Sequence, residues 1–417
     1  MVGKAQAPEP RLDERFLLLV LAAIQFTATV DFLIILPLGP QYMRVFDIDP
    51  GQFGLIVSAY AVAAGISGVT TGIFLDRFDR KRALLWLYLG FTIGTLFCAV
   101  APTYQLLVVA RAVAGAFGGV AGAFILAIIG DVVPEERRGR AMGLVMSSFS
   151  VASICGVPLG LLLASHISWH VPFFALAAIS LLVLAAAASV LPPLRGHLEK
   201  AHDAHPIARL LAVLAEPDHR MAFGFMGVLT FTGFLIFPNL ANYMVLNVGL
   251  TERQLPLIYL CGGLCTVFTM NWIGRWADLS GKPRVFTIMS LGALVPILWL
   301  TNLPRVPLPE AIGVSTLLMI CMSGRFVPAM AMMTASVEGR YRGGFMSMNS
   351  SVQQLASGVA AFLSGHLLGQ APGGQITHYP VIGAISALCA LLCIYLARYL
   401  KSAEGAPGLA EALPVEG

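Results

Sequence analysis

Long apolar runs recur along this chain of 417 residues, and they constrain its fold more than any other feature. Most of them reach the roughly 18 residues that a helix needs to cross about 30 Å of hydrocarbon. The alternation of polar and apolar residues that a membrane β-barrel requires is absent. The chain is 57% hydrophobic and 12% charged, whereas soluble domains carry about 25% charged residues. The sequence therefore predicts an all-α polytopic membrane protein.

Twelve transmembrane helices are predicted. They cover residues 15–42, 53–76, 83–101, 104–128, 141–164, 172–191, 221–246, 254–276, 285–301, 311–334, 344–368 and 379–399. The first of them is too long for a signal-peptide core, and no convincing cleavage site accompanies it, so we expect it to be retained. An even number of spans places both termini on the same side of the membrane.

The distribution of Lys and Arg predicts which side that is. Of the 26 basic residues, 21 fall in the termini and in the loops that share their side. Three fall on the other side (Arg44, Arg253 and Arg305), and two, Arg111 and Arg325, fall inside predicted helices. Both termini are therefore expected in the cytoplasm, with the chain in the cell (inner or plasma) membrane. The net charge of +4 reflects this topology and does not indicate nucleic-acid binding.

The sequence offers no pattern typical of a metal site, a cofactor site or an enzyme. All seven cysteines fall in predicted helices without a Cys-x-x-Cys pair, so we interpret them as small packing residues. No nucleophile, base and metal ligands converge within the spans. A sensor protein would usually carry a large soluble domain, but the longest interior polar stretch, residues 192–220, is short.

An internal repeat divides the chain into two halves. The stretch "GIFLDRFDRKRAL" begins at Gly72, and its relative "GRWADLSGKPRVF" begins at Gly274, 202 residues later. A second pair agrees, since "RRGRAMGLVMSS" begins at Arg137 and "RYRGGFMSMNSS" begins at Arg340. Duplicated six-helix halves are typical of transporters. We expect two six-helix bundles, an N-terminal one over residues 15–191 and a C-terminal one over residues 221–400. An N-terminal segment (1–14), a middle loop (192–220) and a C-terminal tail (401–417), all expected in the cytoplasm, flank and connect them.

These motifs resemble those of the major facilitator superfamily. The resemblance rests on the charged loop after Gly72, on "RAVAGAFGG" in the fourth span and, more loosely, on "CGVPLGLLL" in the fifth. It covers nearly the whole chain and is strongest toward proton-driven drug-efflux and arabinose-efflux-like permeases. It implies two pseudo-symmetric six-helix bundles, alternating access and action as a monomer.

Two departures from the family pattern stand out. The first charged loop has Asp79 where the family usually has Gly, whereas the second copy keeps Gly281. The fifth span reads Gly156-Val157-Pro158-Leu159-Gly160 instead of the G-P-x-x-G-G of antiporters. The second departure weakens an inference of drug antiport, though not of transport.

The charged loops are expected to act as a conformational latch. By resemblance to the family, Asp76, Arg80 and Asp131 would form a charge-relay cluster that holds the two halves in the outward-facing state. Close helix approach at Gly72 would support it, and the second copy offers Gly274 and Asp278. The alternative is that these charges only enforce topology.

One carboxylate cannot be explained by topology. Of the 22 acidic residues, only Asp31 falls near the middle of a span, where a charge costs about 2.5–3.5 kcal/mol on insertion scales. Arg111 is expected to pair with it, because their depths agree within roughly 6 Å at 1.5 Å per residue. The hypothesis is that Asp31 and Arg111 couple transport to protons. A static hydrogen bond between Asp31 and the backbone near Pro37 is the alternative.

Further polar residues within the spans are candidates for substrate binding. They are Gln25, Asn239, Asn242, Tyr243, Asn349, Gln353 and, beside it, Gln354. Such an amide-rich set suits sugars or polar metabolites, although each amide alone is as easily a helix–helix contact. Arg325 would bind an anionic or polar substrate group or, alternatively, the carbonyls freed by Pro328.

The sequence thus predicts a proton-coupled exporter of a small polar or amphiphilic molecule such as a sugar, metabolite or drug. The alternative is a proton-coupled importer, because the motifs do not fix the direction of transport.

Overall fold

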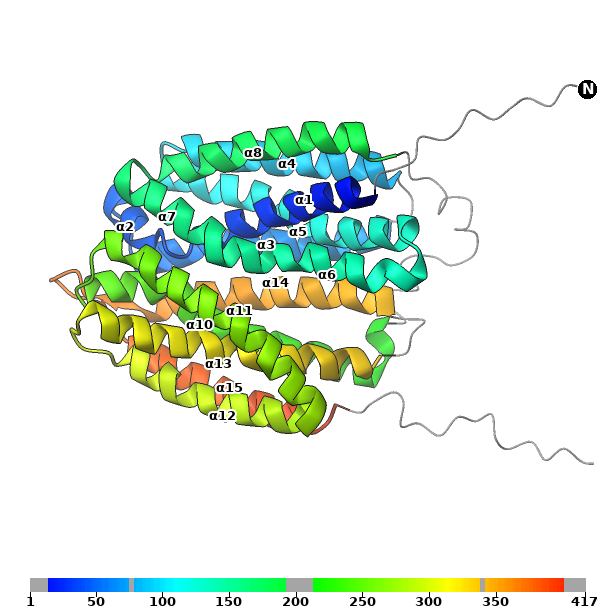
Figure 1. Cartoon of the computed structure of the whole chain (residues 1–417). Coiled ribbons are helices and arrows are strands. Elements are labelled where there is room, and N and C mark those ends of the chain that lie inside the picture. The colour runs from blue at the N-terminus through cyan, green and yellow to red at the C-terminus, as the bar shows by residue number, and fades with distance from the viewer. Residues whose placement is uncertain (1–13, 75–78, 193–212, 338–341, 401–417) are drawn as a thin grey trace, which may run out of the picture.

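The computed structural model describes residues 14–74, 79–192, 213–337 and 342–400, and these are almost entirely helical (Figure 1). The first half contains α1 (Glu14–Ile34), α2 (Gly39–Phe46), α3 (Pro50–Phe74), α4 (Arg80–Val100), α5 (Tyr104–Val132), α6 (Glu135–Val151), the π-helix η2 (Ala152–Gly156), α7 (Val157–His166) and α8 (His170–Val190). The second half contains α10 (Pro217–Leu246), the 3₁₀-helix η3 (Glu252–Gln254), α11 (Leu255–Ser280), α12 (Lys282–Thr301), α13 (Leu308–Ala335), α14 (Arg342–Leu367) and α15 (Tyr379–Ala397). Two short antiparallel strands, β1 (Gly369–Gln370) and β2 (Ile376–Thr377), join α14 to α15.

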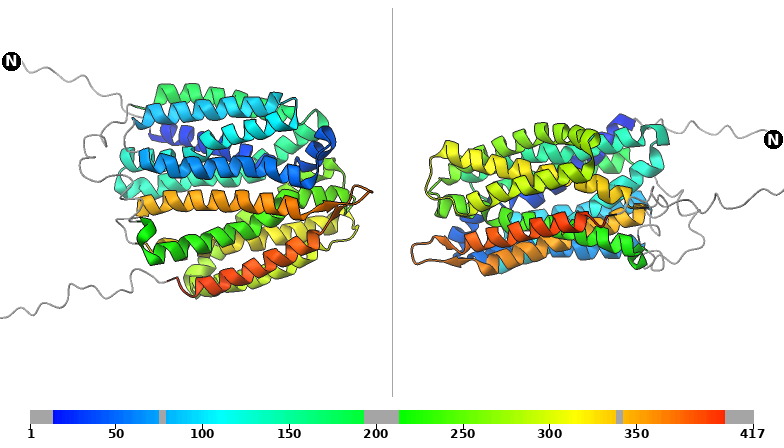
Figure 2. Two further views of the ribbon diagram at one scale, coloured as in Figure 1. Left: turned by 180° about the vertical axis from the view of Figure 1, so that it is seen from behind. Right: turned by 90° about the horizontal axis from the view of Figure 1, so that it is seen from below.

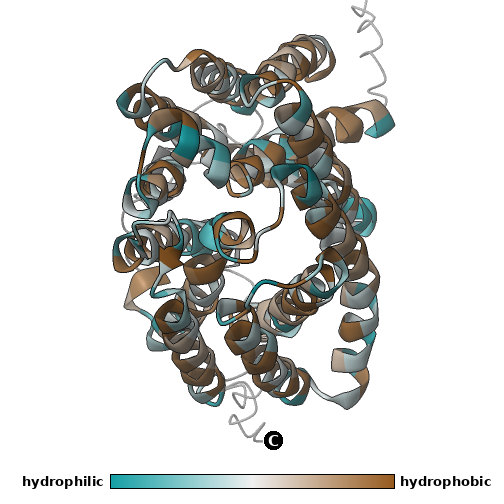
Figure 3. Cartoon of the chain, turned by 90° about the vertical axis from the view of Figure 1, so that its left-hand side faces the viewer, coloured by the Kyte–Doolittle hydropathy of each residue, from teal (hydrophilic) through white to brown (hydrophobic). Residues whose placement is uncertain are grey.

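Eleven helical segments of the described chain are long and apolar enough to cross a bilayer. The twelfth expected span, α14, has comparable length but begins with the polar stretch that carries Asn349 and Gln353. The helices expose large apolar side chains on their outer faces, such as Leu182 (73% exposed) and Phe268 (70% exposed). Figure 3 shows brown, hydrophobic ribbon along much of the bundle surface. Such a surface is stable in lipid and would be unstable in water.

The two halves lie side by side, with α1 to α8 in one layer and α10 to α15 in the other (Figures 1 and 2). The start of α1 and the end of α15 lie at one end of the molecule (Figure 1), which we call the terminal end; the opposite one is the far end. The middle loop 193–212 and the segments 1–13 and 401–417 lie outside the described residues, so the expected domain boundaries there stay predictions.

The helices α3 and α14 hold the halves together along much of their length. Small residues allow this contact, because a Cβ on Gly54 would lie only 2.7 Å from the carbonyl oxygen of Ala361. A Cβ on Gly68 would likewise lie 2.3 Å from the hydroxyl oxygen of Ser351. Helices in lipid associate through close backbone approach of this kind.

Two predicted spans are interrupted in the structure. The span predicted as one helix over 15–42 ends at Ile34, and α2 begins only at Gly39, because Pro37 and Pro40 lack the N–H groups that a continuous helix needs. The span predicted over 141–164 runs from Glu135 to His166 and contains the π-helix η2 just before Pro158. Single π turns of this kind relieve a helix locally and are frequent at functional sites.

The hydrophobic core is shared between the halves mainly toward the far end. There, Tyr42 and Met43 of the first half belong to the same buried cluster as Tyr243 and Met244 of the second. Toward the terminal end the core divides into one cluster from the first half and another from the second. Val69 of α3 is the first-half residue that packs against the second-half cluster in the described structure. An ion pair between Arg44 and Glu252 also joins the halves at the far end. The structure is therefore closed at the far end.

Candidate functional site

The ion pair between Asp31 and Arg111 lies at the centre of the first half. Both side chains are fully buried, and Arg111 Nη1 lies 2.8 Å from Asp31 Oδ2. The same nitrogen also donates to the Asp31 carbonyl oxygen at 3.3 Å. The pairing expected from the depths of the two residues is thus present. The hydrogen bonds recorded for the Asp31 carboxylate go to side chains and not to the backbone near Pro37.

Neighbouring residues fix the orientation of this pair. The hydroxyl of Thr95 on α4 donates to Asp31 Oδ1 at 3.1 Å, so both carboxylate oxygens have a partner. The guanidinium carbon of Arg111 lies 4.4 Å from the centroid of the Tyr60 ring, within reach of a cation–π interaction. The sequence analysis missed Thr95 and Tyr60, since nothing in the sequence distinguishes them from other polar or aromatic residues in apolar helices.

Close helix packing brings these groups together. A Cβ on Gly115 would lie 2.2 Å from the Tyr60 carbonyl oxygen, so α5 touches α3 one turn beyond Arg111. A Cβ on Gly94 would lie 2.7 Å from the backbone nitrogen of Ala114, which brings α4 equally close to α5. Larger residues at either glycine would move the arginine away from its partners.

The site also reaches the second half. The ring of Phe32, next to Asp31, packs between Tyr60 at 5.3 Å and Phe234 of α10 at 5.7 Å between centroids. Arg111 Nε and Nη2 have no hydrogen-bond partner among the described residues. Unpartnered buried donors are costly, so these two nitrogens are suited to bind water or a polar ligand.

The expected binding residues Asn239 and Asn242 are fully buried and hydrogen-bonded to each other at 3.1 Å. Asn239 also donates to Ser364 of α14, whose hydroxyl donates to the Leu235 carbonyl oxygen. Tyr243 donates to the Leu303 carbonyl oxygen at 3.0 Å. In this conformation these three side chains bond to protein groups and hold α10 against its neighbours.

Other amides keep free hydrogen-bonding capacity. Gln25 donates to Thr29 at 3.4 Å, while its Oε1 has no partner within the described chain. Asn349 Oδ1 is buried and equally unpartnered there. Gln353 and Gln354 are half-buried on α14. Asn242 Oδ1 is also buried without a partner in the described structure, so it shares this free acceptor capacity.

Arg325 lies buried in α13, only 1% exposed, in the second half. Its Nε and Nη1 have no hydrogen-bond partner among the described residues, and none of the ion pairs found there includes it. The alternative role that the sequence suggested, hydrogen bonds to carbonyls near Pro328, is therefore not realised by these two nitrogens.

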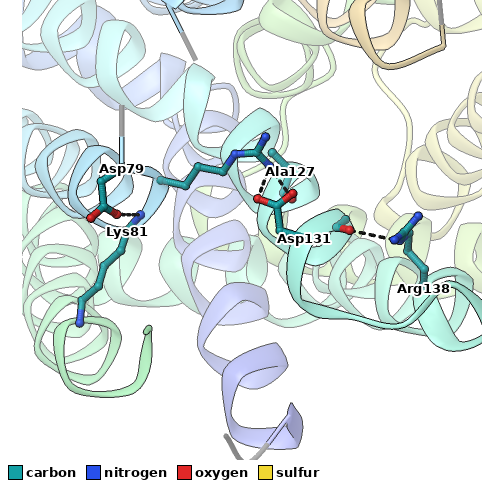
Figure 4. Close-up of polar contacts among 7 residues, drawn as sticks. Asp79, Lys81, Ala127, Asp131 and Arg138 are labelled. Carbon is teal, nitrogen blue, oxygen red and sulfur yellow. Dashed lines mark hydrogen bonds and ion pairs between the residues drawn. The ribbon is translucent and has the colours of Figure 1, made fainter. Parts of the chain in front are cut away.

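The charged loop of the first half is anchored by Arg80 and Asp131. Arg80 Nη1 lies 2.7 Å from Asp131 Oδ2 and also donates to the Ala127 carbonyl oxygen at 2.8 Å (Figure 4). Arg138 donates to the Gly130 carbonyl oxygen at 2.8 Å and caps the same helix end. Both partners of the ion pair belong to the first half, so this contact joins α4 to α5 within one bundle.

The departure of Asp79 from the family pattern has a structural explanation. Its carboxylate accepts from the backbone N–H of Lys81 at 3.0 Å and of Arg82 at 3.5 Å, which makes Asp79 the N-cap of α4 (Figure 4). In the second copy, Gly281 has a φ of 90°, which only glycine adopts without strain. The two loops thus reach the next helix by different means.

The remaining latch candidates are unequally placed. Gly72 lies in the last turn of α3, and Asp76 lies outside the described residues. A Cβ on Gly274 would lie 3.7 Å from Val327 of α13, an ordinary contact. Asp278 is exposed and makes no ion pair within the described chain.

Comparison with known proteins identifies the family. The family model of the Major Facilitator Superfamily matches the chain twice, over residues 21–229 and 221–414. The chain is a member of the major facilitator superfamily. It is a multi-pass membrane transporter that works by alternating access, and members of this superfamily are not enzymes.

Relatives in this superfamily match most of the chain. An uncharacterized MFS-type transporter of Bacillus subtilis, YceJ, is 25% identical over 89% of this chain and 92% of its own length. The inner membrane transport protein YdhP of Escherichia coli is 26% identical over 86% of this chain and 90% of its own. Among solved structures, a D-xylose–proton symporter has a TM-score of 0.74 at 15% identity, covering 91% of this chain and 97% of its own. That match shows the shared fold.

Proposed function

We propose that this protein is a proton-coupled exporter of a small polar or amphiphilic molecule, acting as a monomer in the plasma membrane. The observation that carries the proposal is the buried pair of Asp31 and Arg111. A carboxylate inside the membrane marks a proton or ion pathway by default, because its charge is too costly to serve packing alone.

The proposed cycle uses this pair as a switch. When Asp31 is ionised it holds Arg111, and with it α1 against α5. Protonation of Asp31 removes the charge that binds the guanidinium, and Arg111 is then free for a ligand. Phe32, next to Asp31, contacts Phe234 of α10, and through this contact the proton and the substrate would bias the same rocking motion.

Substrate is proposed to bind between this pair and the amides on the terminal side of it. Gln25 lies six residues before Asp31, and its free oxygen accepts hydrogen bonds, as does that of Asn349 on α14. Two acceptors and a guanidinium suit a molecule with hydroxyl or amine groups, such as a sugar or another polar metabolite.

The terminal end is proposed to be cytoplasmic, because 21 of 26 basic residues belong to that side by the predicted topology. The closed far end would then face outward, and the structure would represent the inward-facing state. The Arg80–Asp131 pair, which the family resemblance assigns to a latch of the outward-facing state, is already formed within the first bundle here. A latch between the halves would then need a further contact from the second half in the outward-facing state.

The test combines binding and transport. Purified protein is screened by thermal shift against sugars, amino acids and antibiotics, and a stabilising compound is then added to vesicles that contain the protein and a pH-sensitive dye. Wild type should move protons upon addition, with a polarity that separates export from import. Asp31→Asn should abolish this movement.

The matched control is Asp47→Asn, an exposed aspartate at the far end whose φ of 51° asparagine also tolerates. It should transport like wild type. Undiminished proton movement in Asp31→Asn, with normal insertion, would refute the assignment of the coupling site.

A further inference from the structure

The second half buries a positive charge that the protein does not neutralise. Arg325 is 1% exposed, and its Nε and Nη1 lack hydrogen-bond partners in the described structure. An isolated charge in a medium of low dielectric constant is unstable unless it is paired and hydrogen-bonded. Arginine does not escape by deprotonation, because a guanidinium keeps its proton in proteins. Arg325 therefore requires a counter-ion.

No carboxylate of the described second half is placed to serve. The acidic residues of this half lie at helix ends, with Asp218 and Glu310 in first turns and Asp278 in the last turn of α11. Glu310 precedes Arg325 by 15 residues, which corresponds to about 22 Å along the helix. The first half differs, since Arg111 has Asp31 within hydrogen-bond distance.

Three thiols are close enough to Arg325 to interact with it electrostatically. They are Cys321, one helical turn earlier on the same face of α13, and Cys389 and Cys393 of α15. A protonated thiol carries no charge, so these groups do not neutralise the guanidinium. The buried guanidinium with its unpartnered N–H groups is therefore the feature that can receive an anion.

We propose that Arg325 of α13 binds a monovalent anion, either a small inorganic anion such as chloride or the carboxylate of a transported molecule. The second source rests on the proposed transport function. In both cases the guanidinium supplies the charge and at least two N–H donors, and planar donors of this kind match a carboxylate well.

The test is a titration of purified full-length protein in nanodiscs with sodium chloride or sodium acetate, at ionic strength held constant with methanesulfonate. Wild type should show a saturable rise in Tm with chloride, acetate or both. Arg325→Gln should lose that rise. Arg44→Gln, which removes an exposed arginine at the far end, should keep it. An absent rise in wild type, or an unchanged rise in Arg325→Gln, would overturn the proposal.

Arg325→Lys keeps the assay decisive if the glutamine variant does not fold. Lysine retains the charge but loses the planar donor pair, so the half-saturating anion concentration should increase. An unchanged half-saturating concentration would contradict the proposed contact. A bromide ion located by anomalous diffraction beside the guanidinium would support it directly.

Two further measurements separate the sources. A carboxylate substrate would compete with chloride in the titration and accumulate in vesicles, whereas a resident inorganic anion would be required for transport without crossing with it. Failure of the transport function would appear as absent proton movement with the anion-dependent Tm intact. Failure of this inference would appear as the reverse.

Discussion

The two halves descend from one repeat but treat their buried arginines in opposite ways. In the first half, Arg111 lies against Asp31, Thr95 fixes the carboxylate, and Tyr60 covers the guanidinium. In the second half, Arg325 lies ten residues further from the start of its helix than Arg111 does from the start of α5, which corresponds to about 15 Å. Its nearby groups include thiols instead of a carboxylate. The two halves thus share the arrangement of helices but differ in where their buried charged residues lie and what surrounds them.

The same contrast appears in the charged loops. Asp131 pairs with Arg80 in the first half, whereas Asp278 is exposed and unpaired within the described chain. The first half thus balances its interior charges within itself, and the second half leaves a positive charge for something else to balance. Under the two proposals made above, the proton and an anionic ligand would be handled by different bundles.

The largest expected effect separates the two arginines. Arg111→Met should lower the free energy of unfolding by about 3–5 kcal/mol, because it strands the buried Asp31 carboxylate. Arg325→Met, measured without chloride or carboxylates, should be neutral or stabilising, since no protein partner is lost. Reversible unfolding in mixed micelles measures both. The double variant Asp31→Asn/Arg111→Met should recover much of the loss, and equal losses in both single variants would break the comparison.

The loop that connects α11 to α12 should be the more sensitive of the two charged loops to backbone changes. Gly281→Ala should cost about 1–2 kcal/mol, because its φ of 90° is unfavourable for any residue with a Cβ. Gly292→Ala is the matched control, since a Cβ there meets nothing within 4 Å in an ordinary helix. That control should be neutral or slightly stabilising in thermal unfolding.

Asp79→Gly tests the corresponding position of the first half. Glycine replaces an aspartate N-cap at a cost of only a few tenths of a kcal/mol, so Tm should barely change, whereas Asp79→Ala should lose about 0.5–2 kcal/mol. A larger loss for the glycine variant than for the alanine variant would mean that the cap is not what selects Asp79.

Asp131→Asn and Asp278→Asn compare the two acidic positions directly. Loss of the partly exposed pair with Arg80 should cost up to about 1 kcal/mol, while the exposed Asp278 has no ion pair to lose. Thermal unfolding at low salt measures the difference, and raising the salt concentration should reduce it. Equal sensitivity of the two positions would show that the loops are equivalent after all.

The smallest effect concerns the contact between the halves at the far end. Arg44→Glu should open that end by repulsion from Glu252, at about 0.2–1 kcal/mol because Arg44 is exposed. Spin-label distances across the far-end loops should lengthen and should return in the double variant Arg44→Glu/Glu252→Arg. Restored distances would show that the pair stabilises closure, and unrestored distances would contradict it.

The sequence indicated the helical spans and the repeat because both depend on local composition. Apolar runs of sufficient length form helices in lipid. The charged loop is repeated, since the stretches that begin at Gly72 and Gly274 are still similar in sequence. The polar residues at the start of α14 did not prevent its prediction as a span, because the rest of its sequence still fits a helix in lipid. The break at Pro37 and the π turn before Pro158 were missed. A proline indicates that a helix is disturbed, but it does not tell whether the helix ends, bends or forms a π turn.

The pairing of Asp31 with Arg111 could be predicted from the sequence because both residues are charged and lie deep within apolar spans. A lone buried carboxylate has few possible partners, and helix geometry gives depth along the membrane. Partners without charge, such as Thr95 and Tyr60, left no such signal. The same limit applies to Asn239 and Asn242, whose hydrogen bond to each other and the bond from Asn239 to Ser364 of α14 only the structure shows, and their role as binding residues stays a prediction.

By itself, the sequence determined the membrane class, the division into two halves and the depth of each charge, because these follow from hydrophobicity and helix rise. Only the tertiary structure decided which face each helix turns to its neighbours. Burial and pairing depend on rotation about the helix axis, and a rotation of half a turn leaves depth unchanged while exchanging every partner. That is why, among the described residues, Arg111 has a charged partner and Arg325 has none.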